Sequence, residues 1–170
     1  MLTVQMKQIL EKGRAAGWIL EPDAKALMQG AGLDIPEFVL ACGPDEAAAF
    51  LEKSSGPVVA KAVSEQIVHK TEARAVVTGI ADADCLSGEV ERLLKLPGCR
   101  EVLVEEMISG IEVIVGAKND YQFGPVVVFG LGGTSVELYN DTAIRMAPLA
   151  PANIPPMVDS LKAGAMLKGF

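Results

Sequence analysis

The sequence is poor in the features that mark several classes of protein. Its 170 residues contain one histidine and three cysteines, with no Cys-x-x-Cys pair, so neither a zinc site nor a disulfide framework is predicted. Glycine, proline or charge interrupts every apolar run well short of the ~20 residues that a membrane helix needs. The opening stretch MLTVQMKQILEKGRAAG has no apolar core of the kind that a signal peptide carries. These absences and the unpaired thiols predict a cytoplasmic protein.

Positive charge is also scarce. The net charge is −7, from 15 basic and 22 acidic residues, and no local basic cluster offsets it. Nucleic-acid binding needs a basic face that releases counterions, so that function is not expected. Half of the residues are apolar and 22% are charged, which is typical of a folded globular chain of one domain or two small lobes.

The hydrophobic pattern predicts an α+β protein. Helical spacing is predicted over residues 3–13, where Gly13 ends the helix, and over 22–32, 44–54, 82–95 and 153–168. Strands are predicted over residues 33–43, 57–63, 75–80, 100–108, 111–119, 125–133, 134–139 and 143–149. Ser109-Gly110 and Asn119-Asp120 separate three of these strands, and both pairs are typical of antiparallel hairpin turns.

Lys61 and His69 are the first candidates for chemistry. Lys61 interrupts the apolar strand PVVAKAV, and a lysine there either faces a cleft where it pairs with a phosphate or lies on the polar face of the strand. His69 is the only histidine and is followed by Lys70 and Thr71. A neutral imidazole can accept a phosphoryl group covalently, but a lone histidine can equally make only a hydrogen bond in a loop.

Two further segments carry polar groups beside strands. In VEEMISGIEV, alternation along the strand puts Glu105 and Met107 on one face and Glu106 on the other. Glu105 or Glu112 can accept hydrogen bonds from a nucleotide, or face solvent on a hairpin. The glycines of VVVFGLGG let backbone amides approach phosphate oxygens, or form a simple turn. The polar residues that follow either orient phosphate or metal or form surface ion pairs: Glu137, Asn140, Asp141 and Arg145.

The order of these segments resembles a known family. The succession PVVAKAVSEQIVHKTE, VLVEEMISGIEVIVGAKNDYQFGPVVVFGLGGTSVELYND and AIRMAPL is similar to the ATP-grasp domain of ADP-forming (NDP-forming) acyl-CoA synthetases, in particular the β subunit of ADP-forming acetyl-CoA synthetase. The resemblance implies a two-lobed α+β domain over residues 1–170 with antiparallel sheets. Its small N-terminal lobe covers about 22–105, and an incomplete second lobe covers about 106–170.

The resemblance also implies roles for particular residues. Lys61 is similar to the strand lysine that binds nucleotide phosphates, with Glu105 and Met107 near adenine and Glu112 near the ribose. His69 is similar to the histidine that takes a phosphoryl group from a partner subunit and passes it to ADP. The phosphate path would be lined by the remaining candidates: Lys70, Arg74, Gly132, Gly133, Glu137 and Arg145.

The chain departs from the family pattern in two places. The family reads H-K-S-D-x-G-G-V after the strand lysine, whereas this chain reads HKTEARAV, with Arg74 and Ala75 at the glycine pair. Arg and Ala adopt positive φ poorly, so either the Arg74 guanidinium replaces the lost amides or the loop has lost phosphoryl transfer. The family also continues past the segment that ends here at Phe170, to an E-x-D-x-N-P strand that carries Mg²⁺ ligands. The metal ligands are therefore expected beyond Phe170.

The predicted function follows from the resemblance. It is an ATP-grasp subunit or fragment of an acyl-CoA synthetase that uses ATP or ADP with Mg²⁺ in the complete enzyme. The partner would be a CoA-binding α subunit or domain, giving a hetero-oligomer. The reaction would be acyl-CoA + ADP + phosphate to acid + ATP + CoA through phosphohistidine. The alternatives are a non-catalytic nucleotide-sensing or assembly module and a purely structural domain.

Overall fold

The computed structural model describes residues 2–67, 70–133 and 141–168 and divides the chain into two compact units. The N-terminal unit is Met1–Ile108 and the C-terminal unit is Ser109–Phe170. The sequence predicted lobes that meet near residue 105 and a first lobe that starts near residue 22. In the structure the first unit also takes in the helix that precedes Pro22.

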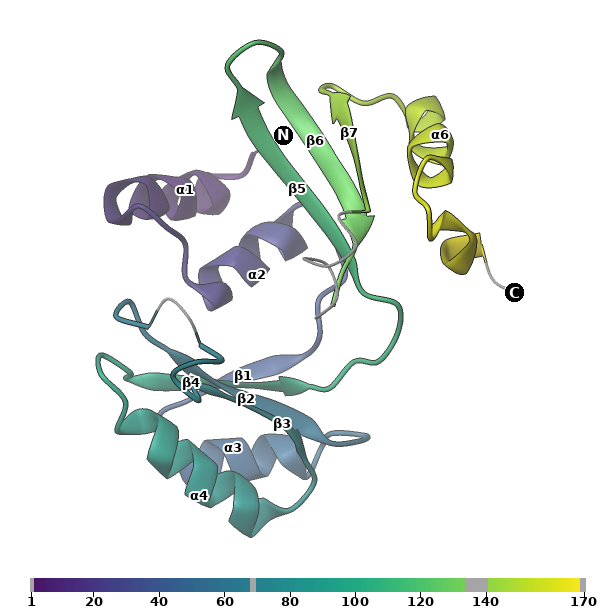
Figure 1. Ribbon diagram of the computed structural model, residues 1–170. Coiled ribbons are helices and arrows are strands. Elements are labelled where there is room, and N and C mark those ends of the chain that lie inside the picture. Colours follow the sequence, from purple (N-terminus) through teal and green to yellow (C-terminus); the bar gives the residue numbers. More distant parts are fainter. Residues whose placement is uncertain (1, 68–69, 134–140, 169–170) are drawn as a thin grey trace. The chain divides into compact units, whose positions relative to one another are not determined.

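A four-stranded antiparallel sheet forms the centre of the N-terminal unit (Figure 1). Its order is β1-β4-β2-β3, so β4 lies between the two strands that come first along the chain. The bounds are Phe38–Ala41 for β1, Val58–Val63 for β2, Val76–Ile80 for β3 and Glu101–Glu106 for β4. The predicted strand over 33–43 is shorter in the structure because Pro36, which has no N–H to donate, precedes the paired residues.

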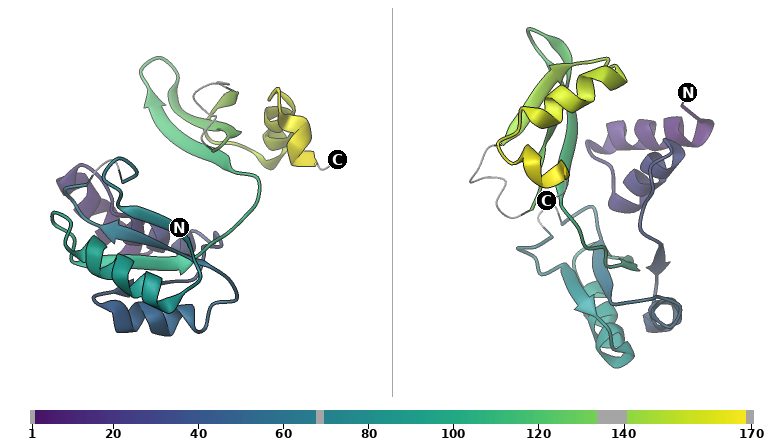
Figure 2. Two further views of the ribbon diagram at one scale, coloured as in Figure 1. Left: turned by 60° about the horizontal axis from the view of Figure 1, so that its bottom comes forward. Right: turned by 90° about the vertical axis from the view of Figure 1, so that its right-hand side faces the viewer.

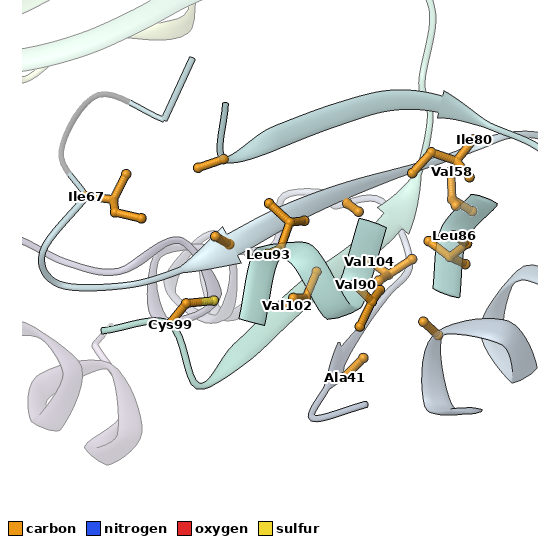
Figure 3. Packing of buried hydrophobic residues seen from close by; sticks show 14 residues of the cluster. Ala41, Val58, Ile67, Ile80, Leu86, Val90, Leu93, Cys99, Val102 and Val104 are labelled. Atoms are coloured by element: carbon orange, nitrogen blue, oxygen red, sulfur yellow. The ribbon is translucent and has the colours of Figure 1, made fainter. Parts of the chain in front are cut away.

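Helices α3 (Pro44–Leu51) and α4 (Ala83–Leu94) cover one face of this sheet. The Asp82 carboxylate accepts a hydrogen bond from the Cys85 N–H and so caps the start of α4. Figure 3 shows the buried cluster between these helices and the strands, with Leu86, Val90 and Leu93 of α4 pointing at the sheet. The alternate residues Val102 and Val104 of β4 belong to the same cluster, as expected for a strand with period two.

Helices α1 (Val4–Ala16) and α2 (Glu21–Gly30) lie on the other side of the sheet from α3 and α4 (Figure 1). The prediction that the first helix ends at Gly13 is wrong, since α1 continues to Ala16 and Gly17 adopts the left-handed C-cap conformation with φ 85°. Gly13 instead packs inside the helix, where an added Cβ would collide with the Ile19 side chain. Pro22 lies in the first turn of α2, as predicted.

The C-terminal unit contains a second antiparallel sheet. Its strands are β5 (Val113–Asp120), β6 (Gly124–Leu131) and β7 (Thr142–Met146), in that order. The predicted hairpin across Asn119-Asp120 is confirmed, since Asn119 pairs with Pro125 and Asp120 with Gly124. The predicted hairpin across Ser109-Gly110 is wrong, because β4 pairs with β1 and β2, and Ser109 begins the second unit.

One face of the second sheet is covered by the last helical segments (Figure 2). These are η1 (Pro151–Asn153), α6 (Ile154–Asp159) and η2 (Gly164–Lys168), in place of the single helical stretch predicted over 153–168. Met157 and Leu161 pack with Ala143 of β7, and Val127 and Phe129 of β6 contribute to the same cluster. The strand predicted over 134–139 lies outside the described residues. None of the described helices has the length and apolarity that crossing a bilayer requires.

Candidate functional site

Five charged side chains meet on the face of the N-terminal sheet that lies opposite α3 and α4. They come from the first turns of α2, from β2, from β4 and from the turn before β3, and we call them the charged cluster: Glu21, Lys25, Lys61, Lys70 and Glu105. Three of them were selected from the sequence. The structure therefore joins residues that lie up to 84 positions apart (21 to 105) in one ion-pair network.

Strand register explains why Lys61 and Glu105 meet. Lys61 pairs with Leu103 and Val59 pairs with Glu105, so Lys61 and Glu105 are diagonal neighbours on one face of adjacent strands. Lys61 Nζ lies 2.5 Å from Glu105 Oε1. The alternate residues of both strands belong to the apolar cluster under α3 and α4, for example Ala60 and Val104. The period-two pattern thus turns the charged residues to the opposite face.

Glu105 is the most buried member of the cluster, with 6% of its surface exposed. Its Oε2 lies 2.5 Å from Lys25 Nζ and accepts no hydrogen bond from the described residues, so this contact is an ion pair alone. Lys25 Nζ also lies 5.5 Å from the centroid of the Phe38 ring, within the range of a cation–π interaction. The two lysines thus occupy both oxygens of Glu105, and this geometry favours a role in holding Lys25 and Lys61.

Glu21 bridges the other two ammonium groups. Lys61 Nζ donates to Glu21 Oε1 at 2.6 Å, and Lys70 Nζ donates to Oε2 at 2.5 Å. Burial raises the pKa of the Glu21 carboxyl, but the hydrogen bonds from Lys61 and Lys70 outweigh burial and hold that pKa below its ordinary value. Burial likewise lowers the pKa of Lys61, and its hydrogen bonds to Glu105 and Glu21 reverse the effect and raise that pKa. Both shifts favour the charged forms of Glu21 and Lys61 at neutral pH.

The charge of the cluster is positive. Three lysines and two glutamates give +3 − 2 = +1. The cluster is partly accessible, because a quarter of the Lys70 side chain and about a fifth of the Lys61 side chain remain exposed. Ammonium groups held in this way make charge-assisted hydrogen bonds to phosphate oxygens. The arrangement can therefore bind an anion and stabilise charge on it.

Lys70 belongs to a closed turn that leads into β3. The Ala75 N–H donates to the Lys70 carbonyl at 2.7 Å, and the Arg74 N–H donates to the Thr71 carbonyl at 3.1 Å. Arg74 has φ 50°, in the left-handed region, and its carbonyl accepts a hydrogen bond from Arg92 of α4 at 2.9 Å. The backbone thus adopts at Arg74 the positive φ that a glycine would adopt more easily.

The C-terminal unit brings three other predicted residues together. The Gly132 N–H donates to the Glu112 carbonyl at 2.7 Å. A Cβ on Gly132 would lie 2.9 Å from the Glu112 carbonyl carbon, so only glycine permits this approach. Gly133 has φ 87°, and its Cβ position lies 3.4 Å from Glu112 Oε2. The turn after β6 therefore fixes the backbone of Glu112.

Among the described residues, Met107, Asp141 and Arg145 belong to neither group. Met107 is 46% exposed just after β4. Arg145 is exposed on β7 and donates to the Ile144 carbonyl. Asp141 accepts hydrogen bonds from the backbone N–H groups of Lys162 and Ala163, which lower the pKa of its carboxyl. Those bonds favour a structural role for Asp141. His69, Glu137 and Asn140 lie outside the described residues.

Sequence reasoning missed Glu21 and Lys25. Both are polar positions near the start of a helix, where acidic residues are common because of the helix dipole. The sequence offered one signal that was not used: residues 21 and 25 are spaced four apart, so they share one face of α2. Their contacts with β2 and β4 depend on tertiary packing.

A magnesium site needs several oxygen ligands. Among residues 2–67, 70–133 and 141–168, no group of three or more His, Cys, Asp or Glu side chains is arranged to hold a metal ion. In the described part of the chain, an anion would therefore be bound by lysines and not by a metal ion held on carboxylates.

Comparisons with known proteins agree with this geometry. A family model described as an ATP-grasp domain matches residues 8–170. The β subunit of ADP-forming acetate–CoA ligase I from Pyrococcus furiosus is 36% identical over 174 residues, which cover 96% of this chain and 74% of that subunit. The ADP-forming acetate–CoA ligase I of Archaeoglobus fulgidus is 32% identical over 172 residues, which cover 97% of this chain and 25% of that protein.

Solved structures agree as well. A crystal structure of a Pyrococcus horikoshii Ot3 protein matches with TM-score 0.87 and 32% identity, over 99% of this chain and 76% of that one. The dinucleotide-forming acetyl-coenzyme A synthetase 1 of Ca. Korarchaeum cryptofilum matches with TM-score 0.81 and 32% identity, over 97% and 75% of the two chains. That structure is a complex with coenzyme A and Mg-AMPPCP, in which the phosphohistidine segment points towards the nucleotide-binding site.

Proposed function

The chain belongs to the ATP-grasp domain family, and from that premise we propose that its charged cluster binds the phosphates of ADP or ATP. The family match confirms the predicted family, and the two antiparallel sheets confirm the predicted α+β fold. The observation that carries the proposal is the net positive network around Lys61, in which Lys61 and Lys70 share one carboxylate. Each charge-assisted hydrogen bond to a phosphate contributes about 1.5–3 kcal/mol.

We further propose the reaction acyl-CoA + ADP + phosphate to acid + ATP + CoA, carried out with a CoA-binding partner subunit. The P. furiosus relative is named as a β subunit, which supports an assembly with other subunits. In the proposed step His69 attacks a phosphohistidine of the partner, so that one P–N bond forms as another breaks. A β-phosphate oxygen of ADP then attacks that phosphorus, so that a P–O bond forms as the P–N bond to His69 breaks, which gives ATP and free His69. Lys70, the next residue in the sequence, is proposed to stabilise charge on that group.

The nucleotide would arrive with Mg²⁺, as the complex of the Korarchaeum synthetase with Mg-AMPPCP suggests. The described residues offer no metal-ligand group, so we assign no step of the reaction to the ion on this chain. Glu112 is proposed to bind the ribose, and Gly132 and Gly133 are proposed to line the path of the phosphoryl group. Glu105 is proposed to hold the lysines, in addition to its predicted place near adenine. A cytoplasmic location is proposed from the free thiols of the described cysteines.

The alternative, a module that binds nucleotide without phosphoryl transfer, rested on the loss of the glycine pair and on metal ligands expected beyond Phe170. The positive φ of Arg74 supports retention of the loop geometry instead. The activity of His69→Ala, measured in the complex reconstituted with its partner subunit, distinguishes phosphoryl transfer from nucleotide binding alone. Full activity of this variant would favour the non-catalytic module.

Thermal melting with and without Mg·ADP tests nucleotide binding. At 100 times Kd a ligand stabilises the native state by about 2.7 kcal/mol, which a melt resolves. Lys61→Met should weaken ADP binding about tenfold to 100-fold, since it removes a charge-assisted contact. The matched control is Lys53→Met, an exposed lysine just past α3. No shift in the wild type, or equal shifts in both variants, would contradict the proposal.

A further inference from the structure

Glu21 occupies the place that an anion would take between two lysines. Its two oxygens lie 2.6 Å from Lys61 Nζ and 2.5 Å from Lys70 Nζ. We propose that Glu21 is an internal counterion that sets the specificity of the phosphate site: polyphosphates displace it and simple carboxylates do not. This inference rests on the proposed function and adds a specificity residue to it.

The position of Glu21 suits a displaceable group. It is the first residue of α2, and the preceding Leu20 makes no side-chain cap. Its side chain is 27% exposed, so it can rotate toward water and recover hydration. Glu105 differs on each count, because it lies on a central strand and its side chain is 8% exposed. Removing Glu105 from its lysines would leave a buried unpaired charge.

Charge explains the discrimination. With Glu21 in place the cluster carries +1. With Glu21 displaced, Glu105 and the three lysines remain and carry +3 − 1 = +2. A carboxylate ligand would replace Glu21 with the same chemical group, so it gains no Coulomb energy. A diphosphate brings more charge and more acceptor oxygens to the same ammonium groups. Because the proposed reaction releases a carboxylic acid, Glu21 would keep that product out of the phosphate site.

Calorimetric titration of ADP, with Mg²⁺ present, tests the inference in 20 mM and in 200 mM potassium acetate. The variants are Glu21→Gln, Glu21→Asp and the matched control Asp23→Asn, which removes a carboxylate from the same helix at the surface ion pair with Lys12. In 20 mM acetate we expect Glu21→Gln to bind ADP about tenfold more tightly than wild type. In 200 mM acetate the ratio should fall to about twofold, since acetate then competes for the open lysines. Asp23→Asn should bind as wild type does.

Each other outcome has a definite meaning. Absence of ADP binding in every protein, wild type included, would refute the proposed function itself. Equal ADP affinity of wild type and Glu21→Gln would overturn the counterion role and leave nucleotide binding intact. Weaker binding by Glu21→Gln would also overturn it, because Glu21 would then position the lysines. If Glu21→Gln melts too low to titrate, Glu21→Asp decides: its shorter side chain keeps the charge but cannot span both ammonium groups, so a several-fold gain is expected.

Discussion

The two units of the chain bury their sheets to different extents. In the N-terminal unit helices lie on both sides of the sheet, and Leu86, Leu93 and Leu103 are fully buried. In the C-terminal unit the described helical segments pack on one face around Met157 and Leu161. Large apolar side chains of that unit remain exposed on its strands: Val113, Ile114, Val115, Ile144 and Met146.

The difference matches the kind of contact that each unit offers. The N-terminal unit supplies charged side chains, whose geometry depends on a rigid sheet beneath them. The C-terminal unit supplies backbone groups at a glycine turn, which holds Glu112 through one hydrogen bond. We therefore expect substitutions in the first unit to act through packing and charge, and those in the second to act through backbone conformation.

The largest expected effect compares equivalent leucines of the two units. Leu93→Ala should lower the free energy of unfolding by about 4 kcal/mol, since its side chain is fully buried in the larger apolar cluster. Leu161→Ala, in the smaller cluster, should lower it by about 2 kcal/mol. Urea unfolding followed by circular dichroism measures both. An equal or greater loss for Leu161→Ala would show that the two units bury their leucines to a similar energetic effect.

The next prediction concerns the glycine turn. Gly132→Ala should lower the free energy of unfolding by about 2 kcal/mol, because the added Cβ would lie 2.9 Å from the Glu112 backbone. Gly116→Ala, on β5, is the matched control: no atom lies within 4 Å of its added Cβ, so a change within about 0.5 kcal/mol is expected. Similar melting temperatures for the two variants would show that the close approach to Glu112 is unimportant.

A smaller effect concerns acid stability. The folded-state pKa of Glu21 is depressed below its ordinary 4.5, so its contribution is present above that value and lost as pH falls through the folded pKa. On acidification from about pH 5 downward, the free energy of unfolding should therefore fall by roughly 1 kcal/mol more for wild type than for Glu21→Gln. Parallel stability curves for the two proteins would exclude this contribution. Asp23→Asn is the control on the same helix.

The smallest effect tests the turn before β3. Arg74→Gly should raise the free energy of unfolding by about 0.5 kcal/mol, because relief of the left-handed conformation exceeds the added entropy of the unfolded chain. Glu72→Gly, in the same turn and without positive φ, should instead lower it by about 0.5 kcal/mol. A stabilised Glu72→Gly or a destabilised Arg74→Gly would contradict the strain at Arg74.

Local patterns predicted much of the fold, and long-range pairing limited the rest. Alternation identified the strand around Lys61, and Pro22 marked the start of α2, because both signals are carried within a few residues. The Ser109-Gly110 hairpin was wrong because turn residues do not specify which strands pair, and β4 inserts between β1 and β2. The prediction that the helix ends at Gly13 was wrong because this glycine is required by close packing against Ile19, a contact that the sequence does not reveal.

The same limit applies to the candidate site. Lys61 and Glu105 were recognised on their own strands, but register alone joins them as diagonal neighbours. Glu21 and Lys25 were missed because polar residues at a helix start usually face solvent, and only the packing of α2 turns them toward the sheet. The roles of His69 and Glu137 remain predictions from the family resemblance.

The most direct test of the phosphate site is nuclear magnetic resonance of the lysine side-chain amines during titration with ADP and Mg²⁺. We expect the largest changes in Nζ chemical shift at Lys25, Lys61 and Lys70, while exposed lysines such as Lys53 and Lys95 change little. Equal changes across all lysines, or none at these three in the presence of saturating ADP, would contradict a phosphate site at the charged cluster.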